Sequence, residues 1–202
     1  RNLYQNGARF LGIDIAPEQI AQAKRLAAEG KMDIDFRVCP AEALNLPDAS
    51  FDVATACTCF FYFDHKTLAL ALHRLLKPGG RVAILYLAWL PLEDPVAAAS
   101  EELILRYNPA WSGSGEQRRV AGVPAEYDAL FETEIQLTRD FAVPFTRESW
   151  NGRMLACRGV GASLPPAQVQ AFSEAHSALL ARIAPPEFTI SHYAAMTVLR
   201  RR

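Results

Sequence analysis

A single carboxylate at the end of an apolar run is the first feature of this sequence that could do chemistry. The stretch FLGIDIAPEQIAQAK (10–24) leads through apolar residues to Asp14 and then turns through Ala16 and Pro17 into a helical pattern. In open α/β sheets, ligands bind beyond the carboxyl ends of the strands. A carboxylate there can accept hydrogen bonds from both hydroxyls of a ribose. Asp14 is therefore a candidate nucleoside-binding residue, and capping of the next helix is the alternative.

The elements that must position Asp14 alternate between strand and helix along the first part of the chain. Apolar or alternating runs predict strands at 8–14 and 33–38, one from about Phe51, and one at 81–89. Helical spacing predicts helices at 17–30 and 65–76, the first ended by Gly30 and the second by the KPGG segment, 77–80. Such alternation implies right-handed crossovers and a parallel sheet with both faces covered.

The last third has a different pattern. The sequence predicts helices at 95–107, 146–159 and 165–183, with Thr146 as an N-cap, and strands at 134–145 and 187–201. The Gly-rich segment 108–124 is expected to be a loop or lid. The two late strands, joined by helices, suggest a hairpin-like addition at one edge of the sheet.

Composition limits the class of partner and the compartment. The 202 residues suit one large α/β domain, and the net charge of −1 gives no electrostatic footprint for nucleic acid or an anionic membrane. No apolar run reaches the roughly 18 residues of a membrane helix. Cys57 and Cys59 are expected on one face of a strand, and the four cysteines as buried, reduced thiols without a metal; a metal or redox role is the alternative. A cytoplasmic protein follows.

Three ordered segments carry a resemblance to a known family. GIDIAPEQIAQAK (12–24), CPAEALNLPDASFD (39–52) and LHRLLKPGGRVAIL (72–85) resemble segments of class I S-adenosylmethionine-dependent methyltransferases, specifically the type 11 group of small-molecule methyltransferases. The resemblance implies a Rossmann-like three-layer α/β/α sandwich, a mostly parallel sheet with an antiparallel C-terminal strand. It implies S-adenosyl-L-methionine as the cofactor.

The resemblance also implies roles for particular residues. Asp14 would hold the ribose and Ile15 would pack against the adenine, whose edge would be read around Ala41 and Glu42. Pro40 departs from the family pattern, because an Asp often accepts a bond from the adenine amino group at this position. Glu42 as a solvated turn residue is the alternative.

The segment CTCFFYF (57–63) should lead from the third expected strand to the place where methionine and acceptor meet. Cys57 and Phe60 would border the cofactor there, and the aromatic rings of Phe60, Phe61 and Tyr62 would favour a sulfonium cation. Core packing of these rings is the alternative. If the reaction needs a general base, His65 is the first candidate and Tyr62 the second. A structural role at the start of the next helix is the alternative for His65.

The family's Gly-rich turn would lie about 20 residues before Asp14, and only 13 residues precede it. The chain is therefore expected to be N-terminally incomplete, with a central strand of the sheet missing. Its 202 residues are expected to form one methyltransferase-like domain. Within it, 1–92 would be the cofactor-binding core, 93–185 the acceptor-side insertions and edge strand, and 186–202 the closing strand.

The expected function is methyl transfer from S-adenosylmethionine to a small-molecule acceptor, by a monomer or homodimer. An inactive methyltransferase-like binding module and a nicotinamide-dependent oxidoreductase are the alternatives. From the end of the fourth expected strand onward, six side chains could line an apolar acceptor pocket, with an arginine to bind an anionic group. They are Trp89, Tyr107, Trp111, Trp150, Arg147 and Arg153. Surface ion pairs would explain the two arginines equally well.

Overall fold

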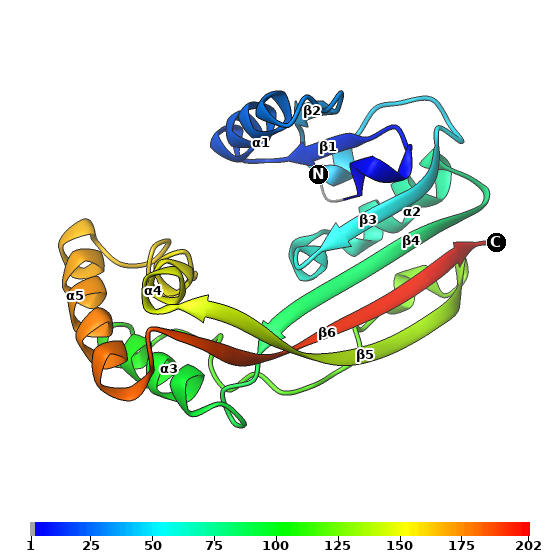
Figure 1. Cartoon of the computed structure of the whole chain (residues 1–202). Helices are drawn as coiled ribbons and strands as arrows, with labels where there is room; N and C mark the ends of the chain where they lie inside the picture. Colours follow the sequence, from blue (N-terminus) through cyan, green and yellow to red (C-terminus); the bar gives the residue numbers. More distant parts are fainter. Residues whose placement is uncertain (1–2) are drawn as a thin grey trace. The chain divides into compact units, whose positions relative to one another are not determined.

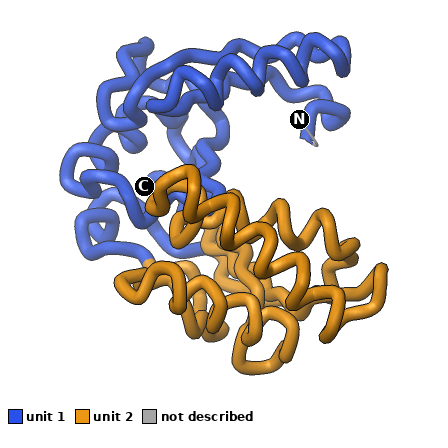
Figure 2. Tube along the Cα trace, turned by 90° about the vertical axis from the view of Figure 1, so that its left-hand side faces the viewer, with its two compact units in different colours: residues 1–83, 123–134, 199–202 blue, residues 84–122, 135–198 orange. Residues whose placement is uncertain are grey.

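The computed structural model describes residues 3–202 and divides the chain into two compact units. Unit 1 contains residues 1–83, 123–134 and 199–202, and unit 2 contains residues 84–122 and 135–198 (Figure 2).

Unit 1 begins with a parallel strand pair. Strands β1 (Leu11–Asp14) and β2 (Asp35–Val38) pair in the register Leu11 to Asp35 and Asp14 to Val38. Helix α1 (Pro17–Glu29) connects them. Pro17 suits the first helical turn because its missing N–H would have no partner there, and Gly30 follows the last turn, as predicted.

The remaining strands form a four-stranded sheet in the order β3-β4-β6-β5. Their bounds are Phe51–Cys57, Leu76–Trp89, Phe131–Thr146 and Glu187–Arg201 for β3, β4, β5 and β6. In Figure 1, β3, β4 and β5 run in one direction and β6 runs in the other. The expected antiparallel C-terminal strand and the hairpin-like edge addition are both confirmed.

β4 differs from the prediction at its start. The strand begins at Leu76, directly after helix α2 (His65–Leu75), so that the segment 77–80 belongs to the strand and not to a separate turn. Gly79 has a φ of 73°, and a Cβ on Gly80 would lie 2.9 Å from the Lys77 carbonyl oxygen. The two glycines therefore still allow the sharp change of chain direction, although both residues belong to strand β4.

The described residues form two sheets, and β1 and β3 belong to different ones. Val38 on β2 and Val53 on β3 are about half exposed, at 53% and 52%.

Unit 2 is built around helices α3 (Pro95–Tyr107), α4 (Arg147–Leu155) and α5 (Pro166–Ile183). Asp94 caps α3 by accepting hydrogen bonds from the N–H groups of Val96 and Ala97. Thr146 caps α4 in a reciprocal capping box with Ser149, which confirms the predicted N-cap. No helix or strand covers the residues between Asn108 and Pro124, as the loop prediction required.

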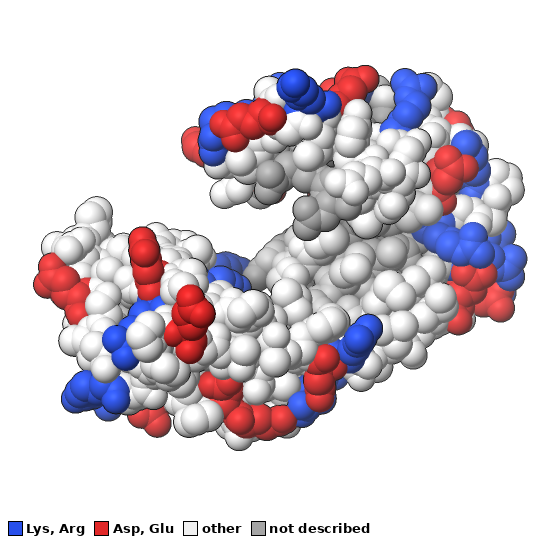
Figure 3. Space-filling model, in the orientation of Figure 1, with Lys and Arg blue, Asp and Glu red and all other residues white. Residues whose placement is uncertain are grey.

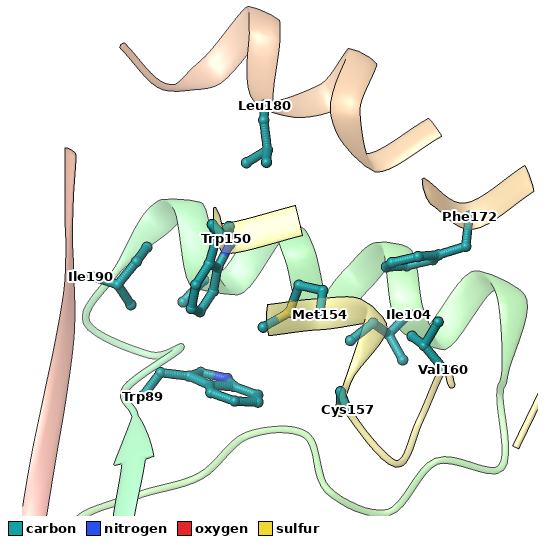
Figure 4. Close-up of a cluster of buried hydrophobic side chains, with 10 residues drawn as sticks. Trp89, Ile104, Trp150, Met154, Cys157, Val160, Phe172, Leu180 and Ile190 are labelled. Carbon is teal, nitrogen blue, oxygen red and sulfur yellow. The ribbon is translucent and has the colours of Figure 1, made fainter. Parts of the chain in front are cut away.

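A cluster of buried apolar side chains holds the three helices together (Figure 4). Trp150 and Met154 of α4 lie between Ile104 of α3 and Leu180 of α5, and all four are fully buried. At about 25 cal/mol per Å² of apolar surface removed from water, such side chains contribute about 1.5–3 kcal/mol each. This cluster forms a hydrophobic core of unit 2.

Among residues 3–202, no helix is long and apolar enough to cross a membrane.

Charged side chains of both signs are interspersed on the face drawn in Figure 3. The ion pairs of the described residues include exposed ones, such as Arg25 with Glu29 and Lys77 with Asp52. This mixed surface agrees with the near-zero net charge.

Candidate active site

Asp14 is the last residue of β1, and its side chain is exposed. Its Oδ1 accepts a hydrogen bond from the Ala16 N–H at 2.8 Å, which shapes the turn into α1. The N-cap residue of α1 is Ala16, so that Asp14 is not the helix cap. The Asp14 carbonyl oxygen accepts from the Cys39 N–H at 3.0 Å and thereby holds the ends of β1 and β2 side by side. Ile15, 72% exposed, follows directly.

The segment after β3 departs from the expected strand geometry. β3 ends at Cys57, and Thr58 has a φ of 57°, in the left-handed region. Cys59 is consequently the N-cap of a short 3-10 helix, η3 (Phe60–Tyr62), and does not share a strand face with Cys57. That prediction is wrong, because alternation of side chains fails where φ becomes positive.

The thiols are less buried than the sequence suggested. Cys157 is buried, Cys39 and Cys59 are partly buried, and Cys57 is exposed; all four are free. Burial raises the pKa of Cys59, and the charges of Cys57 and Asp14 raise it further. The carboxylate at the end of β1 therefore lies close to the segment that follows β3.

The three aromatic residues of η3 divide into two groups. Phe60 is 1% exposed, and its ring packs on His65 and Tyr127 at centroid distances of 4.7 and 5.5 Å. Phe61 and Tyr62 are 43% and 64% exposed. The alternative of core packing thus fits Phe60, and exposed aromatic surface is supplied by Phe61 and Tyr62.

His65 is the first residue of α2, which is capped by the Asp64 side chain. Its Nδ1 lies 3.3 Å from the Tyr127 hydroxyl, and the two rings contact each other edge to face. Burial raises the pKa of Tyr127, with smaller contributions from the charges of Glu126 and Glu42. Tyr127 therefore stays protonated near neutral pH and fixes the orientation of the imidazole.

Ala41 and Glu42 belong to a short 3-10 helix, η2 (Ala41–Ala43). The Glu42 Oε1 accepts a hydrogen bond from the Asp64 N–H at 3.0 Å. The side chain therefore connects the segment after β2 to the start of α2, and is not only a solvated turn residue.

Sequence reasoning did not find Tyr127. It lies in a short 3-10 helix, η4 (Ala125–Tyr127), 62 residues after the His65 that it contacts. An isolated tyrosine between two loops has no periodic pattern, so no local signal indicates that it will be buried.

The predicted acceptor pocket is not observed. Trp150 is fully buried and Trp89 is 9% exposed, and both belong to the core of unit 2. The Arg147 Nε donates to the Ala184 carbonyl oxygen at 2.9 Å, so that this arginine anchors backbone. The prediction for these residues is wrong because aromatic side chains of this size gain more from packing among the helices than from lining a surface.

The remaining residues of that prediction also have other surroundings. The Tyr107 hydroxyl donates to the Ala171 carbonyl oxygen, and its ring packs on Phe172. Arg153 stacks on the Trp89 ring, with Cζ 4.9 Å from the centroid. Arg153 is the one member of the set whose side chain is exposed and pairs with an aromatic face.

A network that the sequence did not indicate holds the loop 108–122 in place. Glu116 accepts hydrogen bonds from the hydroxyls of Tyr86 on β4 and Tyr193 on β6, each at 2.8 Å. Arg118 pairs with Glu93 and Asp140. The loop is thus a fixed part of unit 2.

Residues 1–84 match the methyltransferase domain family. This part of the chain is therefore similar to methyltransferase domains, in agreement with the resemblance of the three sequence segments. Its relatives include a demethylmenaquinone methyltransferase of Thermus thermophilus, 38% identical over 80 residues, which are 39% of this chain and 36% of the relative. A ubiquinone biosynthesis O-methyltransferase of Cereibacter sphaeroides is 28% identical over 151 residues, 74% of this chain and 60% of that one.

A solved structure shows the same fold over nearly the whole chain. The YcgJ protein of Bacillus subtilis superposes with a TM-score of 0.56 at 18% identity, covering 99% of this chain and 85% of that one. The Rossmann-like α/β fold is therefore confirmed. The matches to the two curated relatives span 36% and 60% of their lengths, which is less than two thirds in each case.

The residues at the end of β1 fit the cofactor of this family at its ribose. Asp14 uses Oδ1 for the turn, and its exposed carboxylate has lone pairs left to accept from hydroxyl groups. Ile15 presents exposed aliphatic surface next to it, which suits the face of a purine. Both residues lie on rigid backbone, because the strand end is tied to Cys39.

Proposed function

We propose that this methyltransferase chain transfers a methyl group from S-adenosyl-L-methionine to a small-molecule acceptor. The observation that carries the proposal is the exposed Asp14 carboxylate at the carboxyl end of β1, inside the segment that matches the family. The relatives named for quinone biosynthesis support an acceptor that is a small molecule.

The cofactor supplies an electrophilic methyl group on a sulfonium. The work of the protein is then mainly to bind and orient, since the acceptor atom must approach in line with the breaking bond. Asp14 accepts hydrogen bonds from the ribose hydroxyls and Ile15 packs against the adenine. Backbone groups at Ala41 and Glu42 read the adenine edge, and Cys57 borders the methionine portion.

A base is needed only for acceptors that carry a proton on the attacking atom. His65 is our first candidate, because its Nδ1 is fixed by Tyr127 and the other ring nitrogen is left for proton transfer. Tyr62 is the second. In His65→Asn, methyl transfer to such an acceptor should fall by roughly 100-fold or more, while cofactor binding stays unchanged.

Calorimetric titration with S-adenosylhomocysteine tests the cofactor site. Asp14→Asn keeps the acceptor for the Ala16 N–H and removes the charge, and Asp33→Ala is the matched control at an exposed carboxylate outside the site. We expect saturable binding that weakens at least roughly tenfold in Asp14→Asn, because hydrogen bonds to a charged group contribute about 1.5–3 kcal/mol. Equal affinity of Asp14→Asn and the wild-type chain would remove the ribose assignment.

The same titration on a chain extended upstream by about 50 residues tests the family's Gly-rich turn. Binding by the extended chain only would support the expectation that residues 1–202 lack part of the cofactor site. Binding of NAD in place of S-adenosylhomocysteine would contradict the proposal. Organisation as one domain, a cytoplasmic location and a monomeric or homodimeric state remain part of the proposal.

A further inference from the structure

Arg153 of α4 lies flat on an indole and has no anionic partner. Its Cζ is 4.9 Å from the centroid of the Trp89 ring, and its side chain is exposed. Among residues 3–202, no hydrogen bond or ion pair of Arg153 is found. Arg147, on the same helix, instead donates to the Ala184 carbonyl oxygen. The planar fork of donors on Arg153 is therefore held in place and still available.

The indole beneath Arg153 is fixed on two sides. The Trp89 Nε1 donates to Glu101 Oε1 at 2.6 Å, and the ring meets Trp150 edge to face at a centroid distance of 5.8 Å. Glu101 is itself held, because its Oε2 accepts from the Gly115 N–H at 2.8 Å. A carboxylate on the indole N–H adds electron density to the ring and so strengthens its attraction for the guanidinium. Arg153 thus rests on a rigid platform.

The position in the sheet points to a ligand. Trp89 is the last residue of β4, and ligands of open α/β sheets bind beyond the carboxyl ends of strands. Leu87, two residues earlier on the same face of the strand, is 49% exposed. An available guanidinium at the end of a strand that also exposes an aliphatic side chain suits an apolar molecule with one anionic group.

We propose that Arg153 binds a carboxylate of the methyl acceptor, so that the acceptor is a small apolar acid. This inference rests on the proposed methyl transfer and names its substrate class. A single guanidinium matches one carboxylate better than a doubly charged phosphate, and the Glu101 carboxylate bonded to the same indole disfavours further negative charge. Buried His192, near Arg153, is neutral and adds no charge to the site.

Benzoate and benzamide are suitable probes, because they differ only in the charge of the group that Arg153 would bind. Ligand-observed NMR titrations should show saturable binding of benzoate and at least roughly tenfold weaker binding of benzamide. Arg153→Gln should weaken benzoate binding by a similar factor, and Arg153→Lys should restore only part of it, because an ammonium lacks the bidentate fork. Arg182→Gln, at an exposed arginine of α5, is the matched control and should bind benzoate as the wild-type chain does.

Benzoate binding that is absent from the wild-type chain, or unchanged in Arg153→Gln, would overturn the inference. Titration of S-adenosylhomocysteine into the same Arg153→Gln protein shows that the variant is folded and reports on the proposed function separately. Benzoate binding without S-adenosylhomocysteine binding, both in this chain and in the chain extended upstream, would leave the anion site standing and remove the methyl-transfer proposal. The converse result would remove the anion site alone.

Discussion

The imidazole of His176 and the hydroxyl of Ser100 meet inside unit 2, with Nε2 and Oγ 3.0 Å apart and both side chains fully buried. The other ring nitrogen, Nδ1, donates to Asn151 Oδ1 at 2.8 Å, and the Trp150 Nε1 donates to the same Ser100 hydroxyl at 2.9 Å. The amide of Asn151 is oriented by its bond to Ser173, so that it is the oxygen that faces the imidazole. The Ser100 hydroxyl itself donates to the Val96 carbonyl oxygen at 2.7 Å, so burial away from water, and not a missing partner, disfavours the charged imidazolium.

This arrangement predicts that stability falls in acid. Burial lowers the pKa of His176 from 6.5 to about 4. Between these values the unfolded chain binds a proton that the folded chain does not, so the free energy of unfolding rises with pH through this window. The stabilisation is complete above pH 6.5 and is lost as the pH approaches 4, by about 3 kcal/mol at 1.36 kcal/mol per pKa unit.

Urea unfolding at pH 7 and at pH 4.5 measures this loss. Part of it belongs to His192, whose pKa is also lowered by burial. His176→Gln should therefore shrink the difference between the two pH values without abolishing it. A difference as large as in the wild-type chain would show that His176 does not cause the acid sensitivity.

A second prediction concerns the loop that carries Glu116. In Glu116→Gln, only one of the two tyrosine hydroxyls of Tyr86 and Tyr193 keeps a carbonyl acceptor, and the other can no longer donate to this side chain, so both charge-assisted bonds are lost. The loss should amount to roughly 1–3 kcal/mol, and the loop should open more often. Limited trypsin digestion reports this, since Arg118 and Arg119 lie within the loop.

Cleavage after Arg118 or Arg119 should be faster in Glu116→Gln than in the wild-type chain. Glu102→Gln, at an exposed position on α3, is the control that should leave the rate unchanged. Equal rates in all three proteins would mean that Arg118, with its pairs to Glu93 and Asp140, holds the loop without Glu116.

The capping box at the start of α4 gives a third prediction. Thr146→Ala removes the acceptor for the Ser149 N–H, so the free energy of unfolding should fall by about 0.5–2 kcal/mol. Chemical denaturation measures this change. Thr189→Ala, at an exposed position on β6, lacks a capping role and should have a smaller effect.

Elements with strong local signals could be predicted to the residue. Helix α3 was expected at 95–107 and strand β6 at 187–201, and both have those bounds. Pro95 and Asp94 begin α3 by a local mechanism, and β-branched and aromatic residues favour the strand. The position of Asp14 at the end of β1 could also be predicted, because a carboxylate after an apolar run is a local pattern.

Contacts between segments that are distant in the sequence could not be predicted. Tyr127 reaches His65 from a loop, and Glu116 reaches Tyr193 across 77 residues. Such pairs depend on tertiary packing, which periodicity does not encode. The burial of Trp89 and Trp150 was missed for a related reason, since a tryptophan near a predicted cleft has the same local sequence whether it lines the cleft or fills the core.

The exposed Cys57 gives a prediction that tests the cofactor site without a methyl acceptor. Cys57 ends β3 and is exposed, whereas Cys157 is buried and its pKa is raised by that burial. Cys59 is partly buried and its pKa is also raised, which lowers its thiolate fraction at pH 8. Iodoacetamide should therefore alkylate Cys57 well before Cys59 and Cys157, as peptide mass spectrometry of timed samples would show.

Saturating S-adenosylhomocysteine should slow alkylation of Cys57 by at least roughly tenfold if this thiol borders the methionine portion, since a covered thiol cannot reach the reagent. In Asp14→Asn the same concentration should protect less, because the ribose is held more weakly. Cys39, partly buried after β2, is the internal comparison. Cofactor binding by calorimetry with no protection of Cys57 would keep the ribose site and remove Cys57 from the cofactor-binding residues.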